Sequence, residues 1–573
     1  MAIASPSAPS CCCTTRTGST YRRFSEPIST WAGAKVQCRV LARPAITSRL
    51  NASSDGELVY ELNYSQRRRR GAFPVYVKLP MDVVGPTAQT MRRKKAMAQS
   101  FRALAAAGVE GVVMEVWWGL VEREFPRIYN WQGYLEIVEM AKRFGLKVRA
   151  VMAFHQCGSG PDDLFWIPLP LWVLEEMDKD PDVSYADRFG RRSMEYISLG
   201  CDVLPVLHGR SPIQAYADLM RSFRDTFRSF LGGIITGIQV GLGPGGELRY
   251  PSCPTQKLTR AWRSRELGEF QCYDKYMLAS LRACACKIGM REWGYGGPID
   301  ASSLMQSPES TEFFRSDGSW KTPYGEFFLE WYSGMLLLHG ERICREAETI
   351  FRGNEVNMSG KVGGIHWHYG TQSHPSELTS GYYNTSARDG YIPIVRMFGR
   401  YSFTMCCSCF EMQDAEEQQI NPASRPESFL KQLLLAARIC DIPLEGENYS
   451  TNLDNESFQQ VLKMSKFYSD GLEMPSFSFN FVRMDKNLFE PRNWVSFFAI
   501  CEANVSCQYV SSQLRFQWRP HNLFFFIGFC FCWNGSCVLG REASVRLDLS
   551  CCARTGYRSF NVLFPGQVNA YQT

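Results

Sequence analysis

Between about residues 73 and 500, short apolar runs of strand length alternate with longer segments in which apolar residues recur at helical spacing. Eight runs have the length and composition of buried strands. They are Val75–Leu79, Val112–Trp118, Val148–Phe154, Ile234–Val240, Val362–Trp367, Phe403–Phe410, Ile442–Leu444 and Phe477–Val482. Eight strands separated by helices predict an α/β fold, a (β/α)8 TIM barrel with long strand-to-helix loops.

One helical segment carries its own start signal. Ser211 is a preferred N-cap residue, and Pro212 after it suits the first helical position. The apolar residues that follow recur every three or four positions, which predicts a buried stripe. They are Leu219, Phe223, Phe227 and Phe230. The same spacing predicts a second buried helix from Phe327 to Ile350.

Polar residues gather where the predicted strands end, which is the face of a barrel that carries active sites. From the second strand to the eighth, each has such a residue in or just beyond its last positions. In chain order they are Glu115, His155, Glu247, His366, Ser408, Glu411, Glu447 and Arg483. The sequence therefore predicts one site built from several strand ends.

The most informative position is Glu247, within Gly-Leu-Gly-Pro-Gly-Gly-Glu-Leu-Arg-Tyr-Pro (241–251). Glycines allow a tight turn and a close approach of the backbone to a ligand. Arg249 and Tyr250 add hydrogen-bonding groups beside the acid. Glu447, after the seventh run, is a second acid at a strand end. Two carboxylates from different strand ends are the groups that hydrolysis of a glycosidic bond requires.

The two acids are expected to differ in protonation. We expect the turn to shield Glu247 from water, and desolvation favours the protonated form that a general acid needs. Glu447, next to Asn448 and opposite Lys361 or Arg483, is expected to stay ionised and act as a base. The alternative for either glutamate is a surface salt bridge.

Aromatic side chains near the predicted site have two interpretations. Their flat faces suit stacking against sugar rings, and they are equally suited to filling the core between barrel and helices. They are Trp117, Trp118, Trp166, Trp172 and Tyr250. The loops over residues 155–171 and 247–269 lack periodicity, and long loops inside compact domains are usually functional.

The composition is typical of a soluble globular protein, with 45% hydrophobic and 21% charged residues among 573. A formal net charge of +6 is small for this length, so no nucleic-acid partner is inferred. Arg67–Arg70 is interpreted as a solvated segment before the first strand, the alternative being a nucleic-acid or targeting patch. The aromatic run Leu523–Trp533 is too short to span a bilayer, and no membrane partner is expected.

The two ends differ from the middle of the chain. Residues 1–60 are rich in Ser, Thr, Ala and Arg, with Glu26 the only acid before Asp55. This composition predicts a disordered transit peptide, for a plastid first and a mitochondrion second. Residues 61–72 are expected to be a linker, residues 73–500 the catalytic domain, and residues 501–573 a divergent, poorly ordered extension.

The 22 cysteines are scattered rather than arranged as a framework. Cys406, Cys407 and Cys409 show the spacing of a zinc ligand pair, but no second pair stands at ligand spacing. Reduced thiols in a reducing compartment are the favoured interpretation, and a regulatory disulfide is the alternative.

Six motifs make the region from Pro74 to Trp494 resemble the β-amylases, the glycoside hydrolase family that removes maltose from the non-reducing ends of starch. They are Val-Trp-Trp-Gly (116–119), Phe-His-Gln-Cys-Gly (154–158), the glycine-rich stretch 241–251, Gly-Glu-Phe-Gln-Cys-Tyr-Asp-Lys-Tyr (268–276), Gly-Ile-His-Trp-His-Tyr (364–369) and Gly-Glu-Asn (446–448). Together with the N-terminal composition, they make the chain most similar to the plastid members and imply the chloroplast stroma.

The resemblance implies an inverting mechanism that uses no metal and no organic cofactor. Glu247 matches the family's general acid and Glu447 its general base, with the carboxyl groups roughly 6.5–9.5 Å apart to leave room for water. The positions that the resemblance assigns to sugar binding are Glu115, His155, Asp163, Lys361, His366, Ser408, Asn448, Tyr449 and Arg483. The implied partner is starch or another α-1,4-glucan, and the sequence indicates no oligomeric state.

Some of these positions depart from the family pattern. Glu115 stands where the family usually has Asp, and its extra methylene extends a sugar-binding carboxylate into the pocket. Ser408 replaces a Thr, which keeps the hydroxyl and loses a methyl group. Tyr449 and Ser450 replace Ala-Leu, so a bulky ring and a polar side chain stand where small and apolar groups pack against the sugar.

The loop after His155 departs as well. It reads Gly-Ser-Gly-Pro-Asp-Asp over residues 158–163 instead of Gly-Gly-Asn-Val-Gly-Asp. Asp163 is kept, but Pro161 stiffens a loop that the family closes over its substrate.

Three functional classes remain open on this evidence. The retained glutamates favour an active plastid β-amylase. The altered sugar contacts favour a catalytically weak or inactive relative that binds glucan or regulates its breakdown. A transcription regulator would need a basic helical domain, whereas residues 1–72 offer only a leader and four arginines. Release of maltose separates the first two classes, and nuclear localisation would favour the third.

Overall fold

The computed structural model describes most of the chain between Phe73 and Cys501. The described residues are 73–158, 160–163, 165–252, 267–301, 307–450, 454–469, 476–491, 493–498, 501, 532–533 and 536–537. The predicted transit peptide and linker, and nearly all of the predicted C-terminal extension, lie outside this part. That division of the chain stays a prediction.

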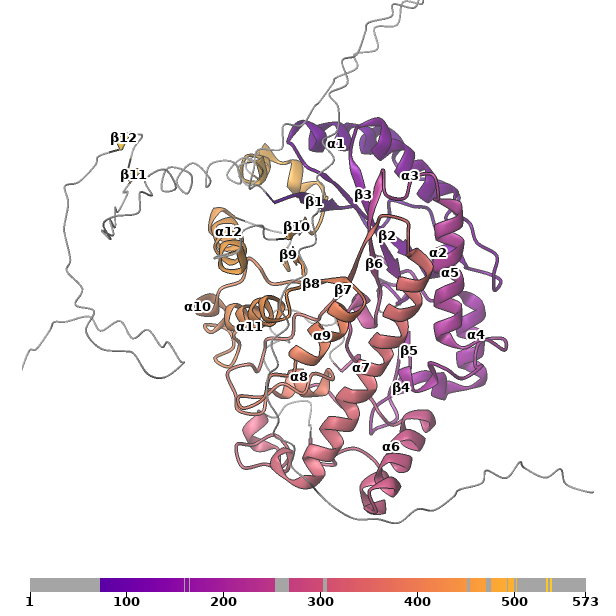
Figure 1. The fold of residues 1–573 in the computed structure, drawn as a ribbon, viewed down its shortest axis with the longest axis vertical. Helices are drawn as coiled ribbons and strands as arrows, with labels where there is room; N and C mark the ends of the chain where they lie inside the picture. Colours follow the sequence, from indigo (N-terminus) through magenta and orange to yellow (C-terminus); the bar gives the residue numbers. More distant parts are fainter. Residues whose placement is uncertain are drawn as a thin grey trace, which may run out of the picture. The chain divides into compact units, whose positions relative to one another are not determined.

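Eight parallel strands close into a barrel, which confirms the predicted (β/α)8 fold (Figure 1). Around the barrel the order is β1, β10, β9, β8, β7, β6, β3 and β2. The strands are β1 (Val75–Lys78), β2 (Gly111–Trp117), β3 (Lys147–Ala153), β6 (Ile235–Val240), β7 (Asn357–Lys361), β8 (Phe403–Cys407), β9 (Leu444–Glu447) and β10 (Phe477–Phe481). Because all eight run in one direction, their carboxyl ends meet at one face.

Helices surround the strands (Figure 1). They are α1 (Lys94–Ala106), α2 (Trp118–Val121), α3 (Gln132–Arg143), α4 (Leu171–Lys179), α5 (Pro212–Thr226), α6 (Lys275–Lys287), α7 (Pro323–Phe351), α8 (Pro375–Thr379), α9 (Ile392–Arg400), α10 (Asp414–Glu417), α11 (Pro426–Ile439) and α12 (Asn455–Ser469). Within the described ranges, none of the helices combines the length and the apolar character needed to cross a bilayer.

Short strands and 3-10 turns complete the described secondary structure. An antiparallel pair, β4 (Ser184–Ala186) with β5 (Arg192–Ile197), is inserted after β3, and a two-residue pair joins β11 (Cys532–Trp533) to β12 (Ser536–Cys537). The 3-10 turns are η1 (Pro181–Val183), η2 (Leu199–Cys201), η3 (Pro244–Gly246), η4 (Arg291–Gly294), η5 (Pro308–Ser310), η6 (Ser319–Lys321) and η7 (Asn487–Phe489). In Figure 1 the β4–β5 pair, α6 and α8 lie together in the lower part of the view, all contributed by connections that leave carboxyl ends of strands.

The fifth predicted strand was misplaced. β7 occupies Asn357–Lys361, and the predicted run Val362–Trp367 forms the loop beyond it, so His366 lies in a loop. The sequence Asn-Met-Ser-Gly-Lys hid the strand because it has one large apolar residue. A Cβ at Gly360 would lie 2.6 Å from the ring of Phe398 in α9, so close packing against the helix favours glycine here.

The sixth and seventh predicted strands also shift. β8 ends at Cys407 rather than at Phe410, and β9 runs from Leu444 to Glu447 rather than over Ile442–Leu444. All four residues of β9 are buried, including Glu445 and Glu447. An apolar run cannot reveal a strand whose inward residues are carboxylates.

The predicted start of the helix at Ser211 and Pro212 is confirmed, although Phe230 of its predicted stripe lies beyond the end of α5. Ser211 Oγ caps α5 by accepting a hydrogen bond from Gln214 N–H, and Gln214 Oε1 accepts a hydrogen bond from Ser211 N–H. Leu219 and Phe223 of the predicted stripe are fully buried, as is Phe227 at the helix end. The second predicted helix is part of α7.

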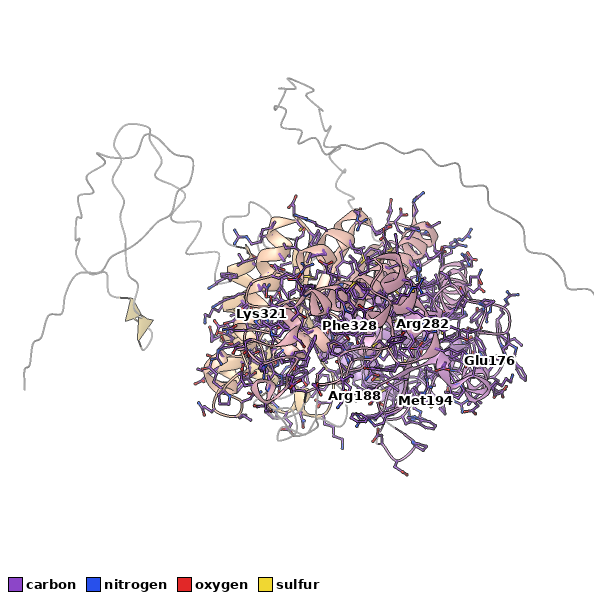
Figure 2. The ribbon with its side chains drawn as sticks, turned by 90° about the horizontal axis from the view of Figure 1, so that it is seen from below. Glu176, Arg188, Met194, Arg282, Lys321 and Phe328 are labelled. Carbon is purple, nitrogen blue, oxygen red and sulfur yellow. The ribbon has the colours of Figure 1, made fainter. Side chains whose placement is uncertain are left out.

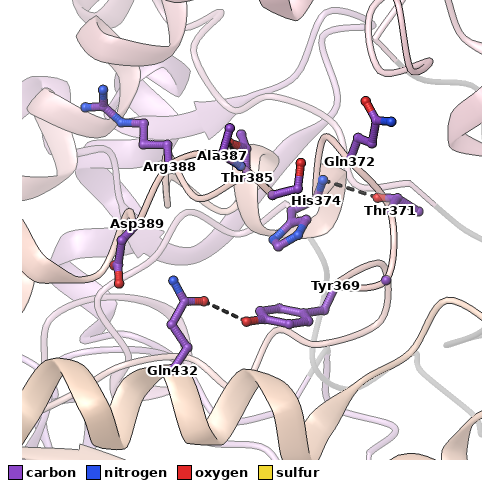
Figure 3. Close-up of a pocket in the computed structure, with 11 residues that line it drawn as sticks. Tyr369, Thr371, Gln372, His374, Thr385, Ala387, Arg388, Asp389 and Gln432 are labelled. Carbon is purple, nitrogen blue, oxygen red and sulfur yellow. Dashed lines mark hydrogen bonds between the residues drawn. The ribbon is translucent and has the colours of Figure 1, made fainter. Parts of the chain in front are cut away.

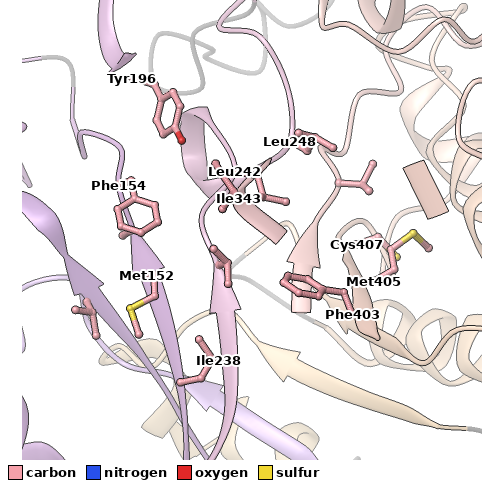
Figure 4. Packing of buried hydrophobic residues seen from close by; sticks show 14 of the residues in the cluster. Met152, Phe154, Tyr196, Ile238, Leu242, Leu248, Ile343, Phe403, Met405 and Cys407 are labelled. Carbon is pink, nitrogen blue, oxygen red and sulfur yellow. The ribbon is translucent and has the colours of Figure 1, made fainter. Parts of the chain in front are cut away.

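The hydrophobic core fills the space between the strands and the helices around them. Figure 4 shows part of it, with Met152, Ile238 and Met405 from three strands and Ile343 from α7, all of them buried. Continuous burial on both faces of the strands is what a parallel barrel requires.

Most of the aromatic rings considered above are core residues. Trp118 packs edge-on against Trp172, with 5.7 Å between ring centroids, and Tyr250 stacks on Tyr332 at 3.9 Å. These three are therefore not sugar-stacking faces. Trp166 is 39% exposed and keeps that role open.

A polar cluster spans the interior of the barrel at the level of Arg149 in β3. The guanidinium donates to Asn480 Oδ1 at 2.8 Å and to Ser478 Oγ at 2.9 Å, and lies 3.4 Å from Glu445 Oε1. Its Cζ also sits 3.8 Å from the centre of the Tyr76 ring. One arginine thus ties β3 to β10, β9 and β1.

Replacing Arg149 by Leu is expected to destabilise the fold by about 3–5 kcal/mol, because Glu445 would then be buried without a cation. The free energy of unfolding in urea measures the effect. Arg143→Leu, at the exposed end of α3, is the matched control and is expected to stay within about 0.5 kcal/mol of the parent. Equal stabilities of the two variants would contradict this role for the interior arginine.

Candidate active site

The turn that carries the first acid follows β6 directly. Gly245 and Gly246 in η3 have φ angles of 63° and 77°, in the left-handed region that suits glycine. Glu247 then forms an isolated parallel bridge with Lys361, and Leu248 N–H donates to the Lys361 carbonyl oxygen at 2.8 Å. The turn therefore returns to the barrel and pairs with the end of β7.

Lys361 joins the two predicted catalytic acids. Its Nζ lies 2.9 Å from Glu447 Oε2 and 3.5 Å from Glu247 Oε1. These two oxygens are therefore at most 6.4 Å apart, the sum of the two distances. Acids far apart in the sequence meet at one ammonium group. The separation expected for the carboxyl groups of an inverting pair stays a prediction.

Glu447 is held as a carboxylate. Burial opposes ionisation, but the nearby ammonium groups of Lys361 and Lys78 outweigh it and lower the pKa of Glu447 to about 2. Only 15% of the Lys361 side chain is exposed, and the two carboxylates raise its pKa well above the usual value. The pair thus keeps the expected base ionised at neutral pH.

Two cations hold the carboxylate of Glu247. Buried Arg249 donates from Nε to Glu247 Oε2 at 2.8 Å, and Lys361 faces the other oxygen. Both carboxylate oxygens therefore face cations, and only 12% of the Glu247 side chain is exposed. Arg249 stands beside the acid as expected, with its side chain folded back onto the residue two positions before it. The protonated state expected of a general acid stays a prediction.

A second ion cluster surrounds Glu115 in β2. Arg483 Nη1 donates to one carboxylate oxygen at 2.8 Å, and Lys78 Nζ lies 3.3 Å from the other. Although burial opposes ionisation, these cations hold the pKa of Glu115 well below its usual range. Arg483 also donates to the Leu79 carbonyl oxygen at 2.6 Å, so the cluster links β1, β2 and the loop after β10.

His155 lies between the two clusters. Its ring is 5.2 Å from that of Trp117, and a Cβ on Gly246 in the acid turn would approach its Cε1 to 3.4 Å. Burial lowers the pKa of His155 to about 3, so the imidazole is neutral at pH 7. Its Nδ1 is buried and has no hydrogen-bond partner among the described residues. A ligand hydroxyl at this position would satisfy it.

Asn448 fixes the chain beyond β9. Its side-chain amide donates to the Val482 carbonyl oxygen and accepts from the Val482 N–H at 2.7 Å, which ties it to the segment before Arg483. Glu411 accepts hydrogen bonds from the N–H groups of Tyr449 and Ser450. Burial raises the pKa of Glu411 to about 7.

The remaining predicted residues lie in loops of the same barrel face. Ser408 is buried directly after β8, and a Cβ on Gly364 would approach its Oγ to 2.6 Å. His366 is buried in the loop after β7, with Nδ1 2.9 Å from Ser424 Oγ. Asp163 is exposed in the loop that follows β3.

Sequence reasoning missed two contributors. Lys78, the last residue of β1, approaches Glu115 and helps to ionise Glu447. A lysine inside the apolar run Val75–Leu79 was the available signal. Glu411 was noted as a strand-end residue but was given no role, although it holds the loop that follows the base.

Two described cavities lie away from these residues. One, of about 540 Å³, is lined by Tyr369, His374, Arg388 and Gln432 among others (Figure 3). There Tyr369 donates to Gln432 at 3.0 Å, and Gln432 exchanges hydrogen bonds with buried Asn384. These side chains satisfy one another and brace the outer side of the loop that carries His366.

A parallel barrel that presents two carboxylates at the carboxyl ends of its strands, joined by a lysine, is the arrangement of a glycoside hydrolase. The comparison with known families agrees with this class. The family described as Glycosyl hydrolase family 14 matches residues 76–505. The chain belongs to that family.

Similar proteins come from plants and bacteria. The chain is 51% identical over 434 residues to "Beta-amylase 1, chloroplastic" of Arabidopsis thaliana, covering 75% of each chain. It is 50% identical over 435 residues to "Beta-amylase 2, chloroplastic" of Oryza sativa subsp. japonica, covering 76% of this chain and 77% of the relative. The crystal structure of the β-amylase catalytic domain of Paenibacillus polymyxa has a TM-score of 0.60 at 24% identity, covering 77% of this chain and 99% of that one. This last likeness supports the barrel fold.

Replacing Lys361 by Met is expected to raise the pKa of Glu447 above about 2 by at least one unit, because burial then acts with less opposition. Carbon-13 NMR titration of the glutamate carboxyls, with the signal assigned from Glu447→Gln, measures the shift. Lys179→Met, an exposed lysine on α4, is the control.

The same substitution has a predictable effect on stability. A depressed carboxyl pKa contributes stability that is present above about pH 4.5 and is lost as pH falls toward 2. Lys361→Met should weaken this dependence. An unchanged Glu447 titration would show that the lysine does not control the ionisation of the base.

Proposed function

We propose that the chain is a β-amylase, which hydrolyses α-1,4-glucosidic bonds of starch from non-reducing ends and releases maltose in the β configuration. The observation that carries the proposal is the pair of Glu247 and Glu447 joined by Lys361. The relatives named β-amylase, at about 50% identity over three quarters of the chain, support the same activity. Retention of both acids argues against an inactive, glucan-binding role.

The proposed mechanism divides two tasks between the acids. Glu247 donates a proton to the glycosidic oxygen as the bond to the anomeric carbon breaks. Glu447 removes a proton from the water that attacks this carbon from the opposite face, which inverts the configuration. Glu447 suits the second task because Lys361 keeps it ionised, so the proton-carrying role falls to Glu247. Glu447 then releases its proton to solvent and Glu247 takes one up from solvent, which restores the starting state.

The surrounding residues are proposed to hold the terminal glucose units by hydrogen bonds. His155 is suited to this role because its neutral ring leaves Nδ1 available to a sugar hydroxyl. Glu115 and Arg483 offer a charged pair whose geometry is already fixed. The further members of the proposed sugar site are Asp163, Lys361, His366, Ser408, Asn448 and Tyr449.

The chloroplast stroma is the proposed location. The composition of residues 1–60 is that of a transit peptide, and the relatives named above are called chloroplastic. Imaging of the full chain fused at its C-terminus to a fluorescent protein tests this proposal, with a fusion that lacks residues 1–60 as the control.

Incubation of the chain with maltoheptaose is expected to release maltose whose anomeric proton first appears as the β form. Proton NMR follows the two anomeric signals directly, before mutarotation equalises them. Glu247→Gln and Glu447→Gln are each expected to lower kcat by a factor of about 10² or more, since each keeps the shape but removes proton transfer.

The fold of each variant is checked by its melting temperature. The matched control is Glu416→Gln, the same chemical change at an exposed position of α10, and it should retain full activity. First release of the α anomer would exclude inversion. A folded parent that releases no maltose would favour the inactive, glucan-binding alternative.

A further inference from the structure

A second cavity, of about 660 Å³, lies in the loops at the carboxyl face of the barrel. Its walls come from the turn between β4 and β5, the residue before the N-cap of α6, η4 and the segment after it, and the chain from Phe313 to the start of α7. None of the residues assigned above to acid, base or sugar binding lines it. Its volume is in the range of small-ligand sites, which is roughly 300–1,000 Å³.

Tyrosine rings and an exposed aliphatic side chain form the apolar part of this cavity. Tyr273 and Tyr324 are half-buried in its wall, whereas Tyr295 is 75% exposed and Ile299 is 76% exposed. A single exposed apolar residue needs no explanation. Here two exposed apolar side chains, Tyr295 and Ile299, stand within five residues of each other and line the same cavity as the rings of Tyr273 and Tyr324. Together they form an apolar surface available to a ligand.

Close packing fixes the shape of the loop behind this surface. A Cβ on Gly297 would lie 3.1 Å from both Phe328 Cζ and Tyr273 Oη, so the close packing favours glycine there. Tyr324 Oη donates to the Gly296 carbonyl oxygen at 3.4 Å. Figure 2 labels Phe328, which packs against Gly297, and Arg188, which lines the cavity. The cavity is therefore formed before a ligand arrives.

The polar groups of the cavity carry both signs of charge. Glu292 and Asp300 contribute exposed carboxylates. Arg188 contributes a guanidinium that lies 3.7 Å from Glu269 and over the Phe189 ring. A charged ligand would meet a like charge on one wall. A neutral ligand with many hydroxyls can donate to the carboxylates and accept from the arginine while its apolar ring face rests on a tyrosine.

We propose that this cavity is a second carbohydrate site, which holds part of an α-1,4-glucan chain away from the acids. The proposal rests on the proposed function, because the substrate of that reaction is a polymer with many identical units. A chain held at the second site keeps its other segments at a high effective concentration near the first. Short oligosaccharides gain nothing from this, whereas long chains do.

The test compares short and long substrates in Tyr295→Ala. The rate constant kcat/KM on soluble amylose is expected to fall by a factor of about three to ten, the loss expected for one aromatic contact. Activity on maltoheptaose should stay within about twofold, since Tyr295 is remote from the acids. Adsorption to insoluble amylose, measured in the Glu447→Gln background to prevent digestion, should weaken in parallel.

Two further variants make the test specific. Tyr295→Phe keeps the ring and should retain most of the amylose activity and adsorption. Ile439→Ala removes an exposed apolar side chain at the end of α11, and it should match the parent on both substrates. If the Tyr295→Ala variant adsorbs to amylose and degrades it as well as the Ile439→Ala variant does, the proposal of a second site is overturned.

This outcome is distinct from failure of the proposed function. A parent that leaves maltoheptaose intact would refute the proposed activity alone, because adsorption to amylose and its loss in Tyr295→Ala would still report on the cavity.

Discussion

The site depends on one largely enclosed ammonium group, that of Lys361. Lys361 lies within salt-bridge distance of Glu247 and Glu447, and without it two carboxylates would approach each other in a region that water barely reaches. Like charges in such a place cannot both stay ionised at low cost. The lysine therefore influences both the protonation of Glu447 and the distance at which Glu247 can stand. Its own position follows from being the last residue of β7.

The backbone delivers the two acids in different ways. Glu447 is part of β9, so its position is set by sheet register, with Asn480 of β10 opposite it. Glu247 stands beyond the end of β6 on a glycine turn, and it is returned to the barrel by its bridge to Lys361. The strand thus fixes one group and the turn places the other. The backbone of Lys361 pairs with the turn that carries Glu247, and its side chain contacts both Glu247 and Glu447.

Much of this arrangement was readable in the sequence. Apolar runs gave the barrel, and the polar residues at their ends gave the two acids and most of their neighbours. The main error has a physical cause: β7 was missed because close packing against Phe398 favours small residues. The sequence did not decide whether the tryptophans stack against sugars or fill the core, because the same residue type serves both roles. Contacts between side chains of different strands, such as that of Lys78 with Glu115, exist only after folding.

The charges of the site nearly cancel one another. Four cationic side chains face three carboxylates, and together they are Lys78, Arg249, Lys361, Arg483, Glu115, Glu247 and Glu447. Each carboxylate has a protein cation as its partner, so the folded chain needs no dissolved counterion to balance it. A neutral polysaccharide that enters such a site exchanges places with water alone. Because short buried ion pairs are screened little by dissolved salt, the affinity of the site is decoupled from the ionic strength of the compartment in which it works.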